Sequence, residues 1–223
     1  MPPNLIIVGD SAFAEIAFEY FTHDSEYNVV GFSVERDFLR RHELAGLPVV
    51  PFDELDKIYA PSDHSVYVAA TYTELNRLRT RLANSAKAMG FRLASYVSSE
   101  AFVWRNVELG EHCFVFEGNV VQPFVRVGRN VVLWSGNHIG HHSVIGDNSF
   151  VSSQVVVSGF VETGENCFLG VNSTIANNVR IGADAWIGPA VVVTKDVGEA
   201  SFLKPAPSER GARSTLEFFG IEA

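Results

Sequence analysis

The chain has 223 residues, a formal charge of −9 at pH 7 and 47% hydrophobic residues. No basic run occurs, which excludes the electrostatic footprint of a protein that binds nucleic acid or an anionic membrane surface. No stretch approaches the ~18 apolar residues of a membrane span, and the N-terminus lacks the basic segment of an export signal. We therefore expect a cytoplasmic protein with two domains.

The first 96 residues alternate between strand and helix patterns, which predicts an α/β domain with a mainly parallel sheet. The long helix is expected to begin with a capping box formed by Thr71 and Glu74 and to end at Gly90. The other expected elements are strands at 5–8, 27–34, 65–70 and 91–96, a helix at 13–21 and a short helix at 52–59.

Candidate ligand contacts follow the strands of this sheet. Ligands of parallel sheets bind beyond the carboxyl ends of the strands, where backbone N–H groups face anions. Gly9, Asp10 and Ser11 follow the first strand, and Glu35 ends the second. One glycine is far short of a dinucleotide fingerprint, so an ordinary tight turn and a solvated loop carboxylate remain alternatives.

Positions 97 to 193 carry a six-residue repeat. A bulky aliphatic residue returns at every sixth position, only Thr163 interrupts the series, and glycine follows eight of these positions. This period predicts an all-β parallel β-helix over 97–200, in which three hexads form an 18-residue coil. The aliphatic positions are Val97, Val103, Leu109, Val115, Val121, Val127, Leu133, Ile139, Ile145, Val151, Val157, Leu169, Ile175, Ile181, Ile187 and Val193.

The coil length predicts which side chains lie above one another. Two aromatic columns are expected, one of Phe124, His142 and Phe160 and one of Phe150, Phe168 and Trp186. Phe114 and the second column are expected on flat outer faces, which self-association would cover.

The two cysteines are not expected to form a disulfide. Cys113 and Cys167 are 54 residues apart, which places them in one column but three coils apart. That separation is about 14 Å at the spacing of stacked strands, too far for a disulfide.

Three of the seven histidines lie within residues 134–143. His141 follows Ile139, which faces inward, so His141 projects outward. There a neutral imidazole can remove a proton from an amine or hydroxyl once its tautomer is held, by Asn137, His138 or a neighbouring carbonyl. A histidine that is merely solvated at the surface and a zinc site shared across an oligomer interface remain alternatives.

The hexad run, the Asn-x-x-x-His arrangement at Asn137 and His141, and the segment 72–79 (Tyr-Thr-Glu-Leu-Asn-Arg-Leu-Arg) resemble a known family. It comprises the acetyl-CoA-dependent sugar acetyltransferases of the left-handed β-helix superfamily. The nearest group, NeuD- and PglD-like proteins and perosamine N-acetyltransferase, acts on nucleotide-linked sugars in bacterial surface-polysaccharide pathways such as O-antigen biosynthesis. The resemblance implies a left-handed β-helix, since the period leaves the hand open.

The resemblance also implies a homotrimer. Acetyl-CoA would lie between neighbouring β-helices, and a Rossmann-like domain at 1–96 would hold the nucleotide sugar. The general base maps onto His141, and one coil on, the N–H of Gly159 would stabilise the oxyanion. The expected catalytic set is His141, His142, Asn137 and His138; the coenzyme contacts are Gly159, Asn177, Lys195 and Lys204; and the substrate contacts are Gly9, Asp10, Ser11, Glu35, Thr71 and Asn76.

Two features depart from the family pattern. Relatives commonly carry an acidic residue beside the base histidine, whereas Gly140 and His142 flank it here, so its orienting partner stays open. The C-terminal tail, 201–223, carries Leu-Lys-Pro-Ala-Pro at 203–207 in place of the usual Gly-Asn-Pro-Ala.

These observations predict an enzyme that transfers an acetyl group directly from acetyl-CoA to an amino or hydroxyl group of a nucleotide-linked sugar, without a metal. Two other functions remain open. One is a zinc-dependent β-helix lyase or hydrase of the γ-carbonic anhydrase type, and the other is a noncatalytic scaffold that binds a nucleotide sugar.

Overall fold

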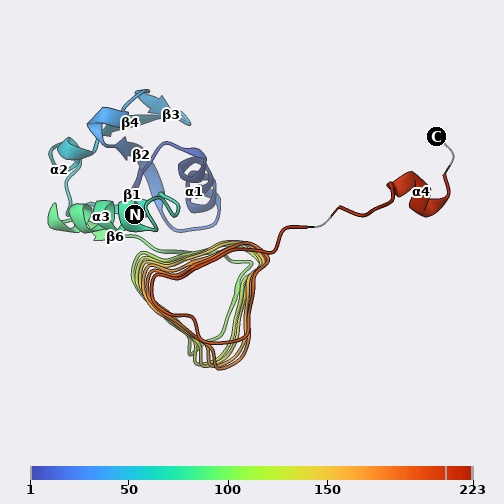
Figure 1. Cartoon of the computed structure of the whole chain (residues 1–223). Helices are drawn as coiled ribbons and strands as arrows, with labels where there is room; N and C mark the ends of the chain where they lie inside the picture. Colours follow the sequence, from blue (N-terminus) through green and yellow to red (C-terminus); the bar gives the residue numbers. More distant parts are fainter. Residues whose placement is uncertain (1, 209, 222–223) are drawn as a thin grey trace.

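The computed structural model describes residues 2–208 and 210–221. The N-terminal part forms a six-stranded sheet in the order β3-β4-β2-β1-β5-β6, and Figure 1 shows it lying against one side of a triangular coil. Its elements are β1 (Asn4–Val8), α1 (Ala12–His23), β2 (Asn28–Val34), η1 (Arg36–Phe38), β3 (Glu43–Leu44), β4 (Leu47–Pro51), η2 (Phe52–Glu54), α2 (Leu55–Ile58), β5 (His64–Val68), α3 (Arg77–Ala88) and β6 (Arg92–Leu93).

The mainly parallel sheet agrees with the expectation. β1 pairs in parallel with β2 and β5, and β4 and β6 extend the sheet on either side. Only β3 is antiparallel, in a hairpin with β4 that the sequence did not reveal. Its two-residue turn has positive φ at Ala45 (50°) and Gly46 (76°), and alanine is an uncommon residue for such a turn.

The capping box expected at Thr71 is wrong. Glu74, Leu75 and Asn76 have φ values of 54°, 50° and 69°, so this segment is a left-handed turn and α3 begins at Arg77. The helix ends as expected, because Gly90 follows its last turn with φ of 94°.

The chain from Tyr96 to Leu203 forms a parallel β-helix whose three sheets each stack one short strand per coil. One sheet packs against the N-terminal domain, and we call it the covered sheet. It contains β7 (Tyr96–Val97), β10 (Phe114–Val115), β13 (Val132–Leu133), β16 (Phe150–Val151), β19 (Phe168–Leu169), β22 (Trp186–Ile187) and β24 (Phe202–Leu203). The apolar sheet contains β8 (Phe102–Val103), β11 (Val120–Val121), β14 (His138–Ile139), β17 (Val156–Val157), β20 (Thr174–Ile175) and β23 (Val192–Val193). The charged sheet contains β9 (Glu108–Leu109), β12 (Arg126–Val127), β15 (Val144–Ile145), β18 (Glu162–Thr163) and β21 (Arg180–Ile181).

The register confirms the 18-residue coil as far as β23, and the last step, from β22 to β24, is 16 residues. Phe114 pairs with Val132 and Val132 with Phe150, while the second residue of each strand points into the coil. Thr163 keeps this inward position because its Oγ1 accepts the N–H of Gly146 at 3.0 Å. The strand β24 pairs with β22, so the coil continues to Leu203, beyond the expected boundary at 200.

Both cysteines are free and buried inside the coil. Burial raises the pKa of each thiol, Cys113 and Cys167, to about 11, so both remain protonated near neutral pH. After Leu203 the chain leaves the body and ends in the short helix α4 (Thr215–Phe219) (Figure 1). Among the residues that the structure describes, no helix is both long and apolar enough to span a bilayer.

The aromatic residues expected on an outer face are buried by the chain's own N-terminal domain. Phe114, Phe150 and Phe168 on the covered sheet are 0%, 2% and 6% exposed, and they share one core with Phe13 and Tyr67. The predicted stacking is confirmed, with ring centroids 6.0 Å apart for Phe150 and Phe168 and 3.9 Å apart for Phe168 and Trp186. Self-association is therefore not what covers this face.

Arg79 on α3 joins the two domains. The side chain is 0% exposed, and burial lowers its pKa to about 10, so it remains charged near neutral pH. No carboxylate pairs with it in the described part of the chain. Its guanidinium instead donates at 2.9–3.3 Å to carbonyl oxygens of Ala70 and Thr71 in its own domain and Asn130, Asn148 and Ser149 in the β-helix.

A buried histidine completes this contact. Burial lowers the pKa of His112 to about 3, so the ring is neutral. The N–H of Val68 donates to its Nε2 at 2.9 Å, which places the ring proton on Nδ1, and Nδ1 donates to Oδ1 of Asn130 at 2.8 Å. The same Oδ1 accepts from Nε of Arg79 at 3.1 Å.

Replacing Arg79 by methionine is expected to destabilise the protein strongly. Methionine fills the site but removes the donor shared by five carbonyl oxygens, two of them in buried contacts, and a buried polar group left unsatisfied costs about 1–3 kcal/mol. We expect the Tm to fall by about 6 °C or more in a thermal melt followed by circular dichroism. The matched control is Arg81→Met on the same helix, which removes only an exposed pair with Glu35 and should shift the Tm little. Equal Tm losses for the two variants would contradict the role of Arg79.

Candidate active site at the His141 corner

His141 lies on the turn between β14 and β15, where the apolar sheet meets the charged sheet. The coil register places four candidate residues at the same turn position of successive coils, which are His141, Gly159, Asn177 and Lys195. The N-terminal domain contacts the covered sheet, so it leaves this corner open.

His141 is exposed and held on two sides. Its backbone N–H donates to Oε1 of Gln122 at 2.9 Å, and its Nδ1 lies 3.1 Å from Nδ1 of His142. The ring lies over Gly159, because a Cβ added to that glycine would be 2.7 Å from Cε1 and 2.9 Å from Nε2 of His141. No hydrogen bond within the described residues occupies Nε2, which leaves this nitrogen accessible to a reactant.

The predicted column of Phe124, His142 and Phe160 is confirmed. The His142 ring stacks on Phe124 at 4.6 Å and on Phe160 at 4.8 Å between centroids. Both phenylalanines are more than half exposed at the open corner. Phe124 and Phe160 enclose the His142 ring from both sides, and we call them the aromatic clamp. His142 has φ of 60°, which directs its ring differently from that of His141 despite their adjacency in the chain.

Gly159 lies beneath His141 as the coil length predicts, but its N–H is already engaged. It donates to Oδ1 of Asn177 at 3.0 Å. Arg129 N–H donates in the same way to Asp147 at another corner, so this bond is a recurrent link between coils. A thioester oxygen that binds here would have to share the Gly159 N–H with Oδ1 of Asn177 or displace that oxygen.

Asn137 and His138 do not orient His141. Asn137 is 1% exposed inside the coil, where it donates to the carbonyl oxygen of Trp134 and accepts from Val155 N–H. His138 is the first residue of β14 and lies on the outer surface of the apolar sheet. The expectation that either residue could hold the tautomer of His141 is therefore wrong.

The N-terminal candidates divide into open and buried positions. Gly9 follows β1 with φ of 131°, and a Cβ there would approach the carbonyl oxygen of Ala69 to 3.0 Å. Next to it, Asp10 lies 3.5 Å from Arg41, and Ser11 is exposed at the N-cap of α1. These residues remain accessible at the carboxyl end of β1.

Glu35 directly follows β2 and forms a two-pronged pair with Arg81, at 2.8 and 3.0 Å. This hydrogen bonding lowers the pKa of the Glu35 carboxyl below its ordinary value. A ribose hydroxyl or base N–H that binds Glu35 must therefore share the carboxylate with Arg81.

Thr71 and Asn76 lie where the N-terminal domain contacts the β-helix. The carbonyl oxygen of Thr71 accepts from Arg79 at 2.9 Å, and the Asn76 side chain is fully buried, with Nδ2 donating to the Cys167 carbonyl oxygen at 3.3 Å. Asn76 is closed to a ligand, so its expected role in substrate binding is wrong for this arrangement of the chain.

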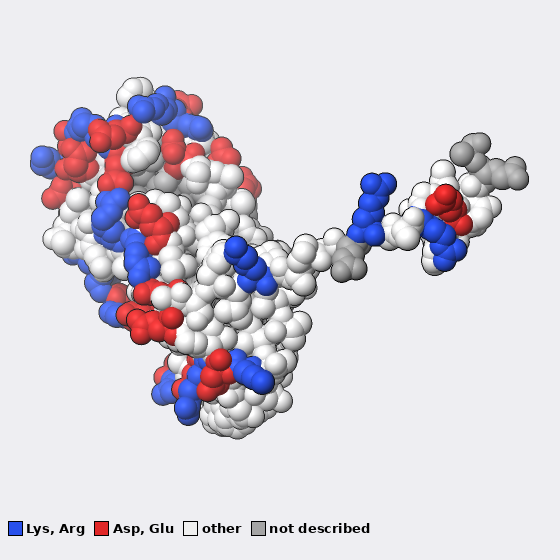
Figure 2. Space-filling view, viewed as in Figure 1, with Lys and Arg blue, Asp and Glu red and all other residues white. Residues whose placement is uncertain are grey.

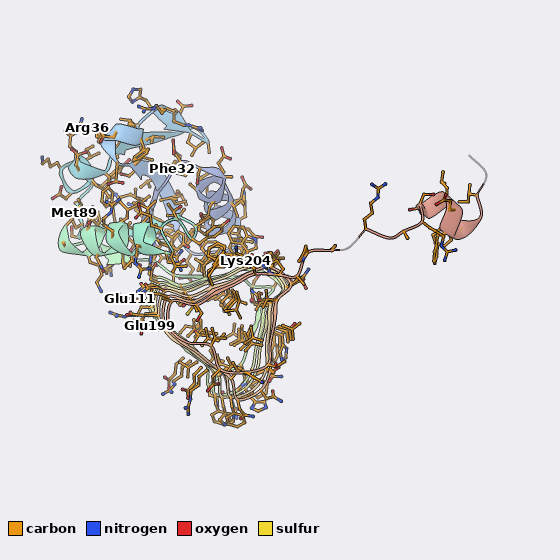
Figure 3. All side chains as sticks on the ribbon, viewed as in Figure 1. Phe32, Arg36, Met89, Glu111, Glu199 and Lys204 are labelled. Carbon is orange, nitrogen blue, oxygen red and sulfur yellow. The ribbon has the colours of Figure 1, made fainter. Side chains whose placement is uncertain are left out.

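The two candidate lysines lie at different corners. Lys195 is exposed and belongs to the His141 column. Lys204 follows β24 at the corner where the tail leaves, as Figure 3 shows, and its Nζ lies 5.4 Å from the centroid of the Phe202 ring. Within one chain Lys204 therefore does not join the His141 site.

Gln122 is a site residue that the sequence inspection missed. It lies 19 positions before His141, one residue outside the 18-residue column, yet its side chain reaches the next coil. The described residues contain no group of three or more His, Cys, Asp or Glu side chains placed to hold a metal ion.

The fold and the hexapeptide repeat of this chain are similar to those of known proteins. The family described as "Bacterial transferase hexapeptide (six repeats)" matches residues 124–159, which include the His141 corner. No curated protein matches the chain. Among solved structures, the acetyltransferase domain of PglB from Neisseria gonorrhoeae is 21% identical with a TM-score of 0.81, and the match covers 90% of this chain and 95% of that one.

A second structure is PerB from Caulobacter crescentus in complex with CoA and GDP-perosamine. It is 25% identical, with a TM-score of 0.77 over 89% of this chain and 92% of that one. The chain has the left-handed β-helix fold of these acetyltransferases. WeeI from Acinetobacter baumannii, 20% identical with a TM-score of 0.60, matches over 89% of this chain and 94% of that one. The resemblance inferred from the hexads is thus confirmed at the level of fold.

Gly159→Ala is expected to abolish most activity without unfolding the coil. The added Cβ would strike the His141 ring, which is an exposed side chain that can move away. Displacing a catalytic group by about 1 Å costs roughly a hundredfold in rate. We expect the kcat of a reaction that depends on His141 to fall about a hundredfold with an unchanged Tm. The control is Gly198→Ala, whose Cβ meets only Ser201 Oγ at 3.7 Å; a Gly159→Ala enzyme as active as this control would contradict the geometry.

Proposed function

We propose that this protein transfers the acetyl group of acetyl-CoA to an amino or hydroxyl group of a nucleotide-linked sugar. The observation that carries the proposal is the exposed His141 imidazole, which lies over Gly159 with Nε2 open, at a corner of a hexapeptide-repeat coil. The likeness to PglB, also solved with acetyl coenzyme A, and to PerB with CoA and GDP-perosamine supports this choice of substrates.

The chemistry requires one proton acceptor and one oxyanion donor. Nε2 of His141 takes the proton from the attacking amine or hydroxyl as its nitrogen or oxygen bonds to the thioester carbon. The carbonyl oxygen becomes an oxyanion, for which the Gly159 N–H is the nearest donor in the column, shared with Asn177. Collapse breaks the carbon–sulfur bond, and His141 returns the proton to the departing CoA thiolate.

The column offers a path for the coenzyme. His141, Gly159, Asn177 and Lys195 follow one another at the spacing of stacked strands, about 4.8 Å per coil. An extended acyl-CoA arm lying along this column would place its thioester at Gly159 and a phosphate near Lys195. Lys204 could join only from another copy of the chain.

The nucleotide sugar is proposed to reach this site from a neighbouring subunit of a homotrimer. The ligand-facing edge at Gly9 and Glu35 belongs to the domain over the covered sheet, whereas His141 lies between the other two sheets. The apolar sheet exposes Phe102 (52%), Val156 (39%) and Val192 (67%), and Figure 2 shows the side of the coil between the tail and the bottom corner largely free of charge. Burying this surface against a second copy would place two half-sites together.

The cellular setting is also part of the proposal. We place the enzyme in the cytoplasm, in a bacterial surface-polysaccharide pathway such as O-antigen biosynthesis. The GDP-perosamine bound to PerB supports a sugar precursor of that kind, and the two free thiols suit a reducing compartment.

His141→Asn should remove the base while preserving the fold. General base catalysis contributes about 10²–10⁴ in rate, so kcat should fall at least about a hundredfold. CoA thiol release would be followed with GDP-perosamine and with a panel of UDP-, GDP- and dTDP-linked amino sugars. His23→Asn, an exposed histidine on α1, serves as the control. A folded His141→Asn enzyme with near wild-type kcat would show that His141 is not the base.

Val156→Arg should dissociate the proposed trimer. A charge in the middle of the apolar sheet would be buried without a partner on association. Light scattering should give about three times the chain mass of 24.5 kDa for the wild type and the chain mass for the variant. Val144→Arg, at the equivalent outward position of the charged sheet, should remain trimeric. A monomeric wild type would refute the assembly.

A further inference from the structure

The neighbouring His142 contacts Nδ1 of His141, the nitrogen whose protonation sets the tautomer of that ring. No carboxylate contacts the His141 ring within residues 2–208 and 210–221. Its Nδ1 meets one polar side-chain atom there, Nδ1 of His142 at 3.1 Å. This distance is within the range of a hydrogen bond between two nitrogen atoms.

Only one arrangement of protons makes this contact compatible with catalysis. A neutral imidazole carries one N–H and one lone pair, so one ring must donate and the other must accept. If His142 donated, His141 would carry its proton on Nε2, and this nitrogen could not act as a base. If His141 donates from Nδ1, its Nε2 retains the lone pair that accepts a proton from the substrate.

The aromatic clamp keeps the acceptor in place. His142 lies between Phe124 and Phe160, with interplanar angles of 27° and 18°. The ring of His141 contacts Phe160 edge-on at 5.1 Å between centroids, so the same phenylalanine also limits its rotation. Stacking of His142 and the edge-on contact of His141 thus restrict both rings without using either of their nitrogens.

We propose that His142 is a positioning residue that accepts the Nδ1–H of His141 on its own Nδ1, so that Nε2 of His141 is the base. A neutral ring here performs the orienting task for which a neighbouring carboxylate is absent. This inference rests on the proposed acetyl transfer, but the proton position can be measured without turnover.

The decisive variant is His142→Phe, which keeps an aromatic ring in the clamp but removes the acceptor nitrogen. We expect kcat to fall about tenfold to a hundredfold, because His141 then prefers the wrong tautomer. KM for acetyl-CoA and the Tm should stay close to the wild type. His142→Asn, whose amide oxygen can accept the same hydrogen and which tolerates a positive φ, should recover part of kcat.

Ring nitrogen NMR provides a readout independent of activity. In protein labelled with ¹⁵N-histidine, the His141 ring should carry its proton on Nδ1 in the wild type and on Nε2 in His142→Phe. A wild-type His141 protonated on Nε2, or a His142→Phe enzyme within twofold of wild-type kcat, would overturn the proposal. If no nucleotide sugar is acetylated by the wild type, the proposed function fails, whereas the NMR result still decides the histidine pair.

Discussion

The buried Arg79 guanidinium is the constraint on which the arrangement of the two domains depends. Its donors are shared between carbonyl oxygens of the N-terminal domain and of two successive coils, so neither domain can shift along the other without leaving buried groups unpaired. Neutral His112 and Asn130 complete the contact. This docking assigns one sheet of the β-helix to the N-terminal domain and leaves the other two sheets, with the corner between them, free.

That division determines how the candidate site can work. The corner presents His141 on a rigid coil, with Gly159 providing the space beneath the ring and the Phe124–Phe160 clamp bounding its outer side. In the proposed function, a single chain supplies the base and the coenzyme column, while its proposed nucleotide-binding edge at Gly9 and Glu35 lies elsewhere. The apolar sheet next to the corner is the surface through which another copy could bring that edge close.

The sequence predicted most of the β-helix because one short period controls it. The period located His141 over Gly159 and separated Cys113 from Cys167, since each position depends only on counting residues. It could not predict contacts that depend on side-chain direction, such as Asn177 accepting the Gly159 N–H. In the N-terminal domain, local rules misplaced the start of α3, because burial of Asn76 against the β-helix overrides the helical propensity of residues 71–76.

The stacking of the coils limits how the column of His141, Gly159, Asn177 and Lys195 can be lengthened. From β14 to β23 the residues of the His141 column follow one another at 18-residue steps, whereas the final coil is two residues shorter and still stacks, since Trp186 pairs with Phe202 and Ile181 with Val197. Each residue added to the column at this turn position therefore brings one further coil of the β-helix. The span that the column offers to an extended ligand therefore changes one coil at a time, in increments of about 4.8 Å.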